Sequence, residues 1–150
     1  LTTYAPSWKN SQTVRYIAIK NKDLKNKIAA ECLNGFAWNK NIIDSANVLM
    51  IELTINNISG YDNDKTATTN KGSHWQSFDA GLFAQTFCLA AHNLGIGSVI
   101  MGIFDENSVK QEPVLAKTDA NDNTNNAVFE NKFEKDKCVN VMHIVFLNYH

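Results

Sequence analysis

The sequence predicts one α+β domain, residues 1–150, in which helices cover a β-sheet. A long apolar segment from Ser77 to Leu94 has the length of a helix and leads through a glycine turn into an apolar strand from Ser98 to Phe104. Two further apolar runs, Ala46–Ile55 and Val139–Tyr149, have the length and composition of strands. A chain of 150 residues that is 44% hydrophobic can bury one core and is too short for two ordinary domains.

Composition and charge exclude several classes of protein. The formal net charge is −1 with 19% charged residues, so we expect no nucleic-acid partner and no anionic membrane surface. The apolar runs are shorter than the roughly 20 residues of a membrane helix, and no signal sequence opens the chain, so a soluble cytoplasmic protein is expected. The cysteines, Cys32, Cys88 and Cys138, lie far apart without metal-ligand spacing, which argues against disulfides and against a zinc site.

The first twelve residues read as a polar loop. Pro6 biases Ala5 away from helix, and the following serine, asparagine and glutamine side chains favour turns. On composition alone, an ordinary surface turn is the better interpretation of this segment.

A strand and an amphipathic helix follow. Thr13–Lys20 alternates and is rich in β-branched residues, which predicts a strand. Asn21 is a typical N-cap for a helix from Lys22 to Leu33, and Asn34-Gly35 is a typical helix end. Residues 36–44 are ambiguous and are compatible with a short helix.

The segment 56–74 has no periodicity and is rich in Asn, Asp, Thr, Lys and Gly. Loops of this length are usually functional or disordered, so the residues alone leave a functional loop and a mobile surface loop as equally good interpretations.

The helix Ser77–Leu94 is apolar around most of its circumference, which predicts that it is buried nearly all round. Gly81 would cost about 1 kcal/mol against alanine in a helix, so we expect a tight helix contact there. Gly95 is placed to end the helix in the left-handed conformation.

The C-terminal third is expected to contain a short helix, a polar segment and a final strand. Asp105 is expected to cap a short helix, Asp105–Gln111, and residues 112–137 form a polar excursion that is at best partly ordered. The strand Val139–Tyr149 then closes the sheet. His143 lies among core-type residues, so we interpret it as a structural histidine and not as a ligand or a general base.

Motifs for protein-borne catalysis are absent from the sequence. It contains no GxSxG, Walker or GxGxxG motif and no convincing Cys/His pair. The run GIGSVIMG leads into a strand, whereas a phosphate-binding loop opens a helix.

Two segments resemble the nitroreductase-like flavoproteins. These are the run FDAGLFAQTFCLAAHNLGIGSVIMGIFDENSVK and the earlier APSWKNSQ, Ala5–Gln12, and the resemblance spans residues 4 to 112. It implies a three-layer sandwich with a central, mostly antiparallel sheet flanked by helices. It also implies a homodimer with the central helix at its interface and an FMN cofactor.

The resemblance further implies the reaction. In such proteins a hydride passes from NAD(P)H to N5 of FMN and then, in a ping-pong cycle, to a small-molecule electron acceptor such as a nitroaromatic or a quinone. The protein supplies binding and orientation while the flavin carries the chemistry, so no catalytic side chain is expected.

Cofactor-binding residues follow from the same resemblance. Ser7 and Asn10 match positions that reach the flavin, and Asn56 or Asn57 could reach the pyrimidine side of the ring. Pro6 and Gln12 match positions that fix the loop, and Trp8 is placed to stack nearby. Along the strand that runs past flavin N5, the implied residues are Ile100, Met101 and Gly102. The resemblance also implies that the connection 56–74 borders the active site and serves substrate access.

Two departures from the family pattern stand out. Thr13 follows Gln12 where the family usually has proline, and the basic elements that hold the FMN phosphate before the APS segment and beyond the last strand are missing; Arg15 is the only arginine. Either the chain is trimmed, which we expect, or it binds flavin weakly or not at all. The competing function is a non-catalytic homodimeric module of the same fold that binds another small ligand.

Overall fold

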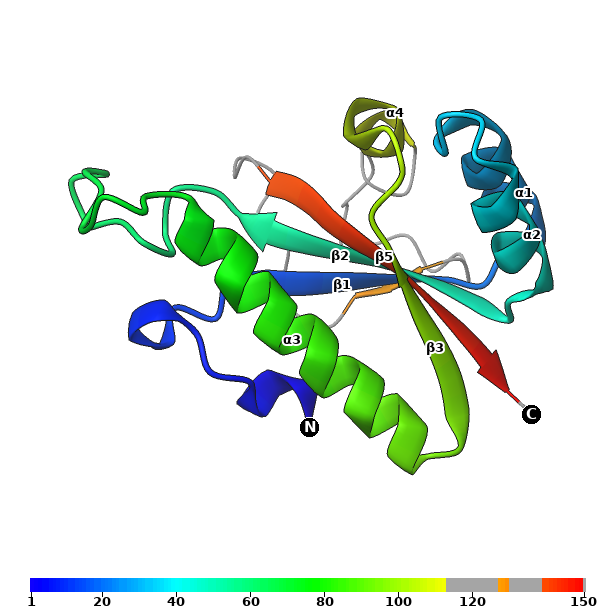
Figure 1. Ribbon diagram of the computed structural model, residues 1–150, viewed down its shortest axis with the longest axis horizontal. Coiled ribbons are helices and arrows are strands. Elements are labelled where there is room, and N and C mark those ends of the chain that lie inside the picture. Colours follow the sequence, from blue (N-terminus) through cyan, green and yellow to red (C-terminus); the bar gives the residue numbers. More distant parts are fainter. Residues whose placement is uncertain (113–126, 130–138, 150) are drawn as a thin grey trace.

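The computed structural model describes residues 1–112, 127–129 and 139–149. In chain order the elements are η1 Thr2–Tyr4, η2 Trp8–Asn10, β1 Val14–Ile19, α1 Lys22–Glu31, α2 Ala37–Ser45, β2 Val48–Ile55, α3 His74–Asn93, β3 Ile96–Met101, α4 Glu106–Gln111, β4 Ala127–Phe129 and β5 Val139–Tyr149. Figure 1 shows α3 running diagonally across the sheet that these strands form. No helix in the described part of the chain is long and apolar enough to cross a membrane.

The described strands form one sheet in the order β3-β5-β2-β1-β4, and every neighbouring pair is antiparallel. The last strand, β5, was expected to close the sheet but lies inside it, between β2 and β3. Its register pairs Ile51 with Ile144 on one side and Met101 with Ile144 on the other. The short strand β4, which the sequence did not predict, pairs with β1 at the opposite edge.

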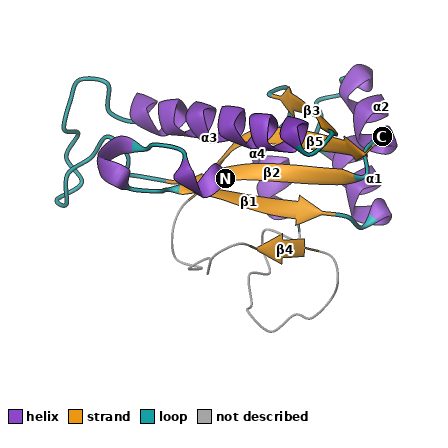
Figure 2. Ribbon diagram, turned by 90° about the horizontal axis from the view of Figure 1, so that it is seen from below, coloured by secondary structure: helices purple, strands orange, loops and turns teal. Residues whose placement is uncertain are grey.

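Alternate residues of β1 and β2 face two different helical layers. Ile17 and Ile51 belong to the larger core, which contains buried residues of α1, α2 and α4. Val14 and Val48 face the other way, where they pack with residues of α3 such as Phe83 and Ala91 in two smaller clusters. The expected three-layer sandwich is therefore confirmed, and Figure 2 shows α3 lying along one face of the sheet.

Local capping signals at two helices are confirmed. The side chain of Asn21 accepts a hydrogen bond of 2.8 Å from the N–H of Leu24 at the start of α1. Asp105 accepts one of 2.6 Å from the N–H of Ser108 at the start of α4. Each bond satisfies a donor that the first helical turn leaves without a partner.

The helix α3 is not buried nearly all round, so this prediction is wrong for the single chain. It begins at His74, three residues earlier than expected, and it leaves a stripe of exposed residues. The stripe comprises Phe78, Gly81, Gln85 and Leu89, of which Phe78 is 56% and Leu89 59% exposed. A side chain added at Gly81 would meet no described atom within 4 Å, so the tight contact expected there is not made within the chain.

The strand after α3 is displaced from its expected position. Gly95 ends the helix with φ +75°, as predicted, but β3 spans Ile96–Met101 instead of Ser98–Phe104. Gly102 consequently lies just beyond the strand. Most of the polar excursion, residues 113–126 and 130–138, lies outside the described residues.

Candidate functional site

The loop from Pro6 to Gln12 has an unusual and closed backbone. Lys9, Asn10 and Gln12 all adopt positive φ, at 47°, 54° and 48°. L-residues rarely occupy this left-handed region, although asparagine tolerates it better than most. The N–H of Gln12 donates to the hydroxyl oxygen of Ser7 at 2.9 Å, which closes the loop.

One carboxylate on α3 holds this loop. The backbone N–H of Trp8 is shared between both oxygens of Asp79, at 3.0 and 3.1 Å. The hydroxyl of Ser59 donates to the same carboxylate at 2.7 Å. Asp79 is 1% and Ser59 0% exposed, so a buried charge is satisfied by donors from two segments far apart in the chain.

Aromatic rings extend the contact between the loop and α3. The ring centroids of Trp8 and Trp75 lie 4.6 Å apart, and those of Trp75 and Phe78 lie 5.6 Å apart. The ammonium groups of Lys9 and Lys71 lie 5.7 Å from the Trp8 ring and 5.0 Å from the Trp75 ring respectively. These distances suit cation–π attraction and place positive charge around an aromatic pair.

The segment between β2 and α3 is held by defined contacts. Gln76 accepts a hydrogen bond of 2.9 Å from the N–H of Asn57, and its amide lies 3.5 Å from the side-chain oxygen of Asn56. Lys9 forms an ion pair of 2.9 Å with Asp62, and this hydrogen bond lowers the pKa of the Asp62 carboxyl. Residues 56–73 thus pack against both α3 and the N-terminal loop.

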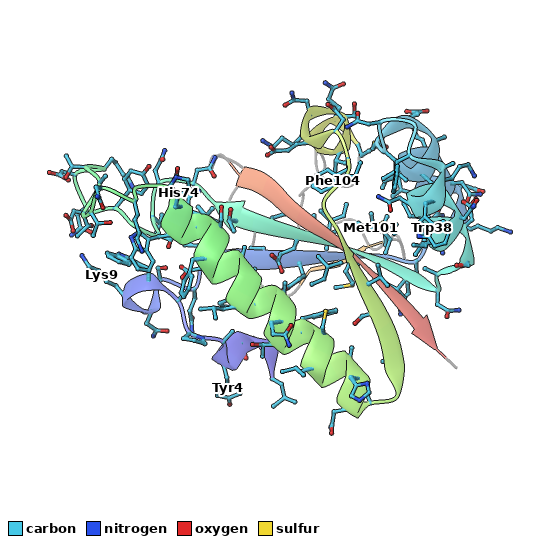
Figure 3. The ribbon with its side chains drawn as sticks, in the orientation of Figure 1. Tyr4, Lys9, Trp38, His74, Met101 and Phe104 are labelled. Atoms are coloured by element: carbon cyan, nitrogen blue, oxygen red, sulfur yellow. The ribbon has the colours of Figure 1, made fainter. Side chains whose placement is uncertain are left out.

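The residues expected beside flavin N5 lie apart from the Pro6–Gln12 loop in the folded chain. Ile100 is exposed, Met101 is 4% exposed and packs in the larger core, and Gly102 is exposed with open space within 4 Å of an added Cβ. Figure 3 shows Lys9 beside the start of α3, whereas Met101 and Phe104 lie across the sheet from it. These two groups of residues, which the resemblance assigns to the flavin and which we name half-sites, therefore lie apart within the one chain.

Uncharged polar side chains and open space mark the positions that the resemblance assigns to the flavin. In the N-terminal half-site, Asn10 and Gln12 present exposed amide side chains and Pro6 is exposed, whereas Ser7 and Trp8 are half-buried. Gly102 leaves space at the second half-site. The guanidinium of Arg15, however, donates to the backbone oxygens of Gln12 at 2.6 Å and Val14 at 2.8 Å, and burial lowers its pKa. The described residues therefore contain no arginine cluster for a phosphate group.

Sequence reasoning placed the loop but missed the residues that fix it. Asp79, Gln76 and Ser59 are all buried polar residues with partners in other segments. The available signal was an aspartate among apolar residues of the longest helix, because a charge at such a position requires donors nearby.

Comparisons with known proteins identify the family and the fold. A family model described as Nitroreductase family matches residues 1–119. A nitroreductase family protein from Clostridium novyi NT superposes with a TM-score of 0.69 at 19% identity, covering 99% of this chain and 68% of that chain. A proposed nitroreductase from Desulfovibrio desulfuricans, solved in complex with FMN, gives 0.63 at 19% identity, with 99% and 67% covered.

A third similar structure comes from Staphylococcus epidermidis and is described as a proposed NAD(P)H:FMN oxidoreductase. Its TM-score is 0.68 at 15% identity, and the match covers 99% of this chain and 71% of that chain. The search of curated proteins found no match. At these identities the solved structures show a shared fold, and this chain spans about two thirds of the length of the first two.

Proposed function

Because the chain belongs to the nitroreductase family, we propose that it is a flavin-dependent oxidoreductase that binds FMN and reduces small electrophiles with NAD(P)H. The observation that carries the proposal is the Pro6–Gln12 loop, whose backbone is fixed while the Asn10 side chain remains exposed. A preordered loop with free polar groups loses little conformational entropy when a ligand binds. One structure of the same fold is described in complex with FMN, and another as a proposed NAD(P)H:FMN oxidoreductase.

Each half-site has a distinct role in this proposal. Ser7 and Asn10 would hold the polar edge of the flavin ring, since the Ser7 hydroxyl keeps its own hydrogen for donation after accepting from Gln12. Gly102 would leave room for the ring beside the backbone of Ile100 and Met101. When bound, FMN supplies the hydride chemistry, and nitroaromatics or quinones are the proposed acceptors.

A homodimer would bring the two half-sites together. The exposed stripe of α3, with Phe78 and Leu89 at either end and Gly81 between them, is the proposed contact surface. Covering large apolar side chains with a partner lowers the free energy of the assembly, and the glycine permits a close approach of a second helix. A site shared across two copies explains why one chain separates the Pro6–Gln12 loop from Gly102.

One observation favours a second candidate function. Arg15, the only arginine of the chain, is engaged with backbone oxygens of the loop, so it is poorly placed to hold a phosphate. A non-catalytic homodimeric module that binds flavin weakly, or binds another flat ligand, is compatible with this arrangement.

Absorbance spectroscopy of the purified protein distinguishes the two functions. After incubation with FMN and gel filtration, the oxidoreductase should be yellow, should bleach anaerobically with NADH or NADPH, and should recover its colour with a quinone. Protein that binds FMN but is not reduced by either nucleotide would favour the non-catalytic module. A colourless dimer that shows no FMN binding in an equilibrium titration would contradict the flavin proposal.

A further inference from the structure

Asp79 connects three parts of the chain that lie apart in sequence. Its carboxylate, on the second turn of α3, accepts from the N–H of Trp8 and from the hydroxyl of Ser59. The Trp8 contact spans 71 positions and the Ser59 contact 20. Because the carboxylate is 1% exposed, water cannot replace these donors.

The Pro6–Gln12 loop, which Asp79 holds, has backbone angles that are unfavourable in the absence of other contacts. Lys9, Asn10 and Gln12 adopt left-handed φ values within four positions. Such a run persists only where surrounding contacts determine it. Within the loop the Ser7–Gln12 bond provides one contact, and the Trp8–Asp79 bond ties the loop to a regular helix.

The same helical turns also hold the second segment. Gln76, one turn before Asp79, accepts from the N–H of Asn57, while Asp79 accepts from Ser59. Both residues are buried, and both bind groups from residues 56–59. The start of α3 is therefore a common support for the N-terminal loop and for the segment after β2.

We propose that Asp79 is a positioning residue for the ligand site: its carboxylate fixes the Trp8 amide and the Ser59 hydroxyl, so that the Pro6–Gln12 loop and residues 56–59 are presented to the ligand in one arrangement. The inference rests on the proposed flavin function, because it assigns the loop to FMN. Asp79 itself touches no ligand in this proposal and acts through Trp8, Ser7 and Asn10.

Three variants separate positioning from general stability. Asp79→Ala removes both contacts. Asp79→Asn keeps one oxygen for the Trp8 N–H, and its amide can donate to the Ser59 oxygen. Ile43→Val, in the core on the opposite face of the sheet, is the matched control for mild destabilisation without any change near the loop.

Two measurements are made on each variant. The first is hydrogen exchange at the Trp8 amide of the apoprotein, and the second is the Kd for FMN from an equilibrium titration. Asp79→Ala should speed Trp8 exchange and raise the Kd, each on the order of tenfold, because a buried donor loses its acceptor and the loop loses its fixed arrangement. Asp79→Asn should stay near the parent in both, and Ile43→Val should match the parent at Trp8 whatever its melting temperature.

Several results would overturn the inference. Unchanged Trp8 exchange in Asp79→Ala would show that the carboxylate does not order the loop. Faster exchange with an unchanged FMN Kd would show that this order does not matter to the ligand. Equal losses in the Asn and Ala variants would show that charge, not hydrogen bonding, is responsible. If the parent protein itself does not bind FMN, the proposed function fails and the ligand role of Asp79 fails with it, whereas the exchange data still decide whether Asp79 orders the loop.

Discussion

The backbone N–H of Gln12 donates to the hydroxyl oxygen of Ser7 at 2.9 Å, and this bond closes the loop that carries Asn10. Asn10 itself sits at φ 54° with an exposed side chain. The amide is thus presented on a backbone that has already lost its freedom in the absence of ligand. Preorganisation of this kind is a physical reason for a polar residue on a strained loop to bind tightly.

Asn10→Ala should weaken FMN binding. The substitution would leave a polar edge of the flavin ring without its partner, at a cost of about 1 to 3 kcal/mol, or roughly 5- to 150-fold in Kd. Titration of the apoprotein with FMN, followed by flavin fluorescence, measures the change.

Asn34→Ala is the matched control for that experiment. Asn34 is also an exposed asparagine, with φ 49°, but it lies in the turn after α1. Both substitutions place alanine in the left-handed region, so their backbone costs should be similar. A Kd for Asn10→Ala equal to that of Asn34→Ala would remove Asn10 from the flavin site.

Gly102→Val should give a folded dimer without flavin. Open space surrounds an added Cβ at Gly102, and its φ lies outside the left-handed region, so overpacking and backbone strain are both small. If the ring lies over this position, the new methyl groups occupy its place, and Gly102→Ala should show a smaller loss. Bound flavin and melting temperature are measured on the same sample. A yellow Val variant with a strongly lowered melting temperature would contradict the ligand role.

Local chemistry made part of the fold predictable. The caps at Asn21 and Asp105 depend on residues three positions away, and both form as expected. The start of β3 depends on a partner far along the chain: Ile96 pairs with Tyr149. Ladder pairing with β5 therefore extends the strand toward Gly95, and no local pattern contains that information.

The exposed stripe of α3 shows a second limit of prediction from the sequence. Apolar composition around the helix predicted burial, but one chain covers only the sides that face the sheet and the N-terminal segment. In the candidate site, too, local features were predictable and long-range contacts were not. The loop Pro6–Gln12 was predicted as a loop, whereas its left-handed backbone and its anchor at Asp79 arise from a contact across 71 positions.

Leu89→Arg should convert the proposed dimer to a monomer. Leu89 is 59% exposed at the end of the α3 stripe, and an arginine there would place a charge in an apolar contact. Trp38→Arg is the control, because Trp38 is 71% exposed on α2, in the layer on the other face of the sheet. Light scattering at micromolar concentration should give a monomer for the first and a dimer for the second. A monomeric parent protein would contradict both the proposed dimer and the proposed site shared between two copies.

Cys32 should resist alkylation in the folded protein. Burial, with the nearby Glu112 carboxylate next in importance, raises the pKa of its thiol to about 11. At pH 8 only about one thiol in a thousand is then the reactive thiolate, and the side chain is inaccessible. Cys88 is half-buried and should label faster with iodoacetamide, as peptide mass spectrometry would show. Equal labelling of the two in folded protein would contradict this, and equal labelling in denaturant is the control.

Asp105→Ala should destabilise the protein, and the effect should depend on pH. Asp105 caps α4 by accepting from the N–H of Ser108 at 2.6 Å, and hydrogen bonds from Ser108 lower the pKa of its carboxyl. A carboxyl with a lowered folded-state pKa stabilises the fold above its ordinary value of about 3.9, and this contribution is lost as the pH falls through the folded-state pKa. Asp105→Ala should therefore melt a few degrees below the parent at pH 7, and the gap should narrow at acidic pH. Asp105→Asn keeps the acceptor without the titrating proton, so its gap from Asp105→Ala should stay constant across the same range. A gap between parent and Asp105→Ala that is equal at neutral and acidic pH would show that the ionised carboxylate does not stabilise this helix.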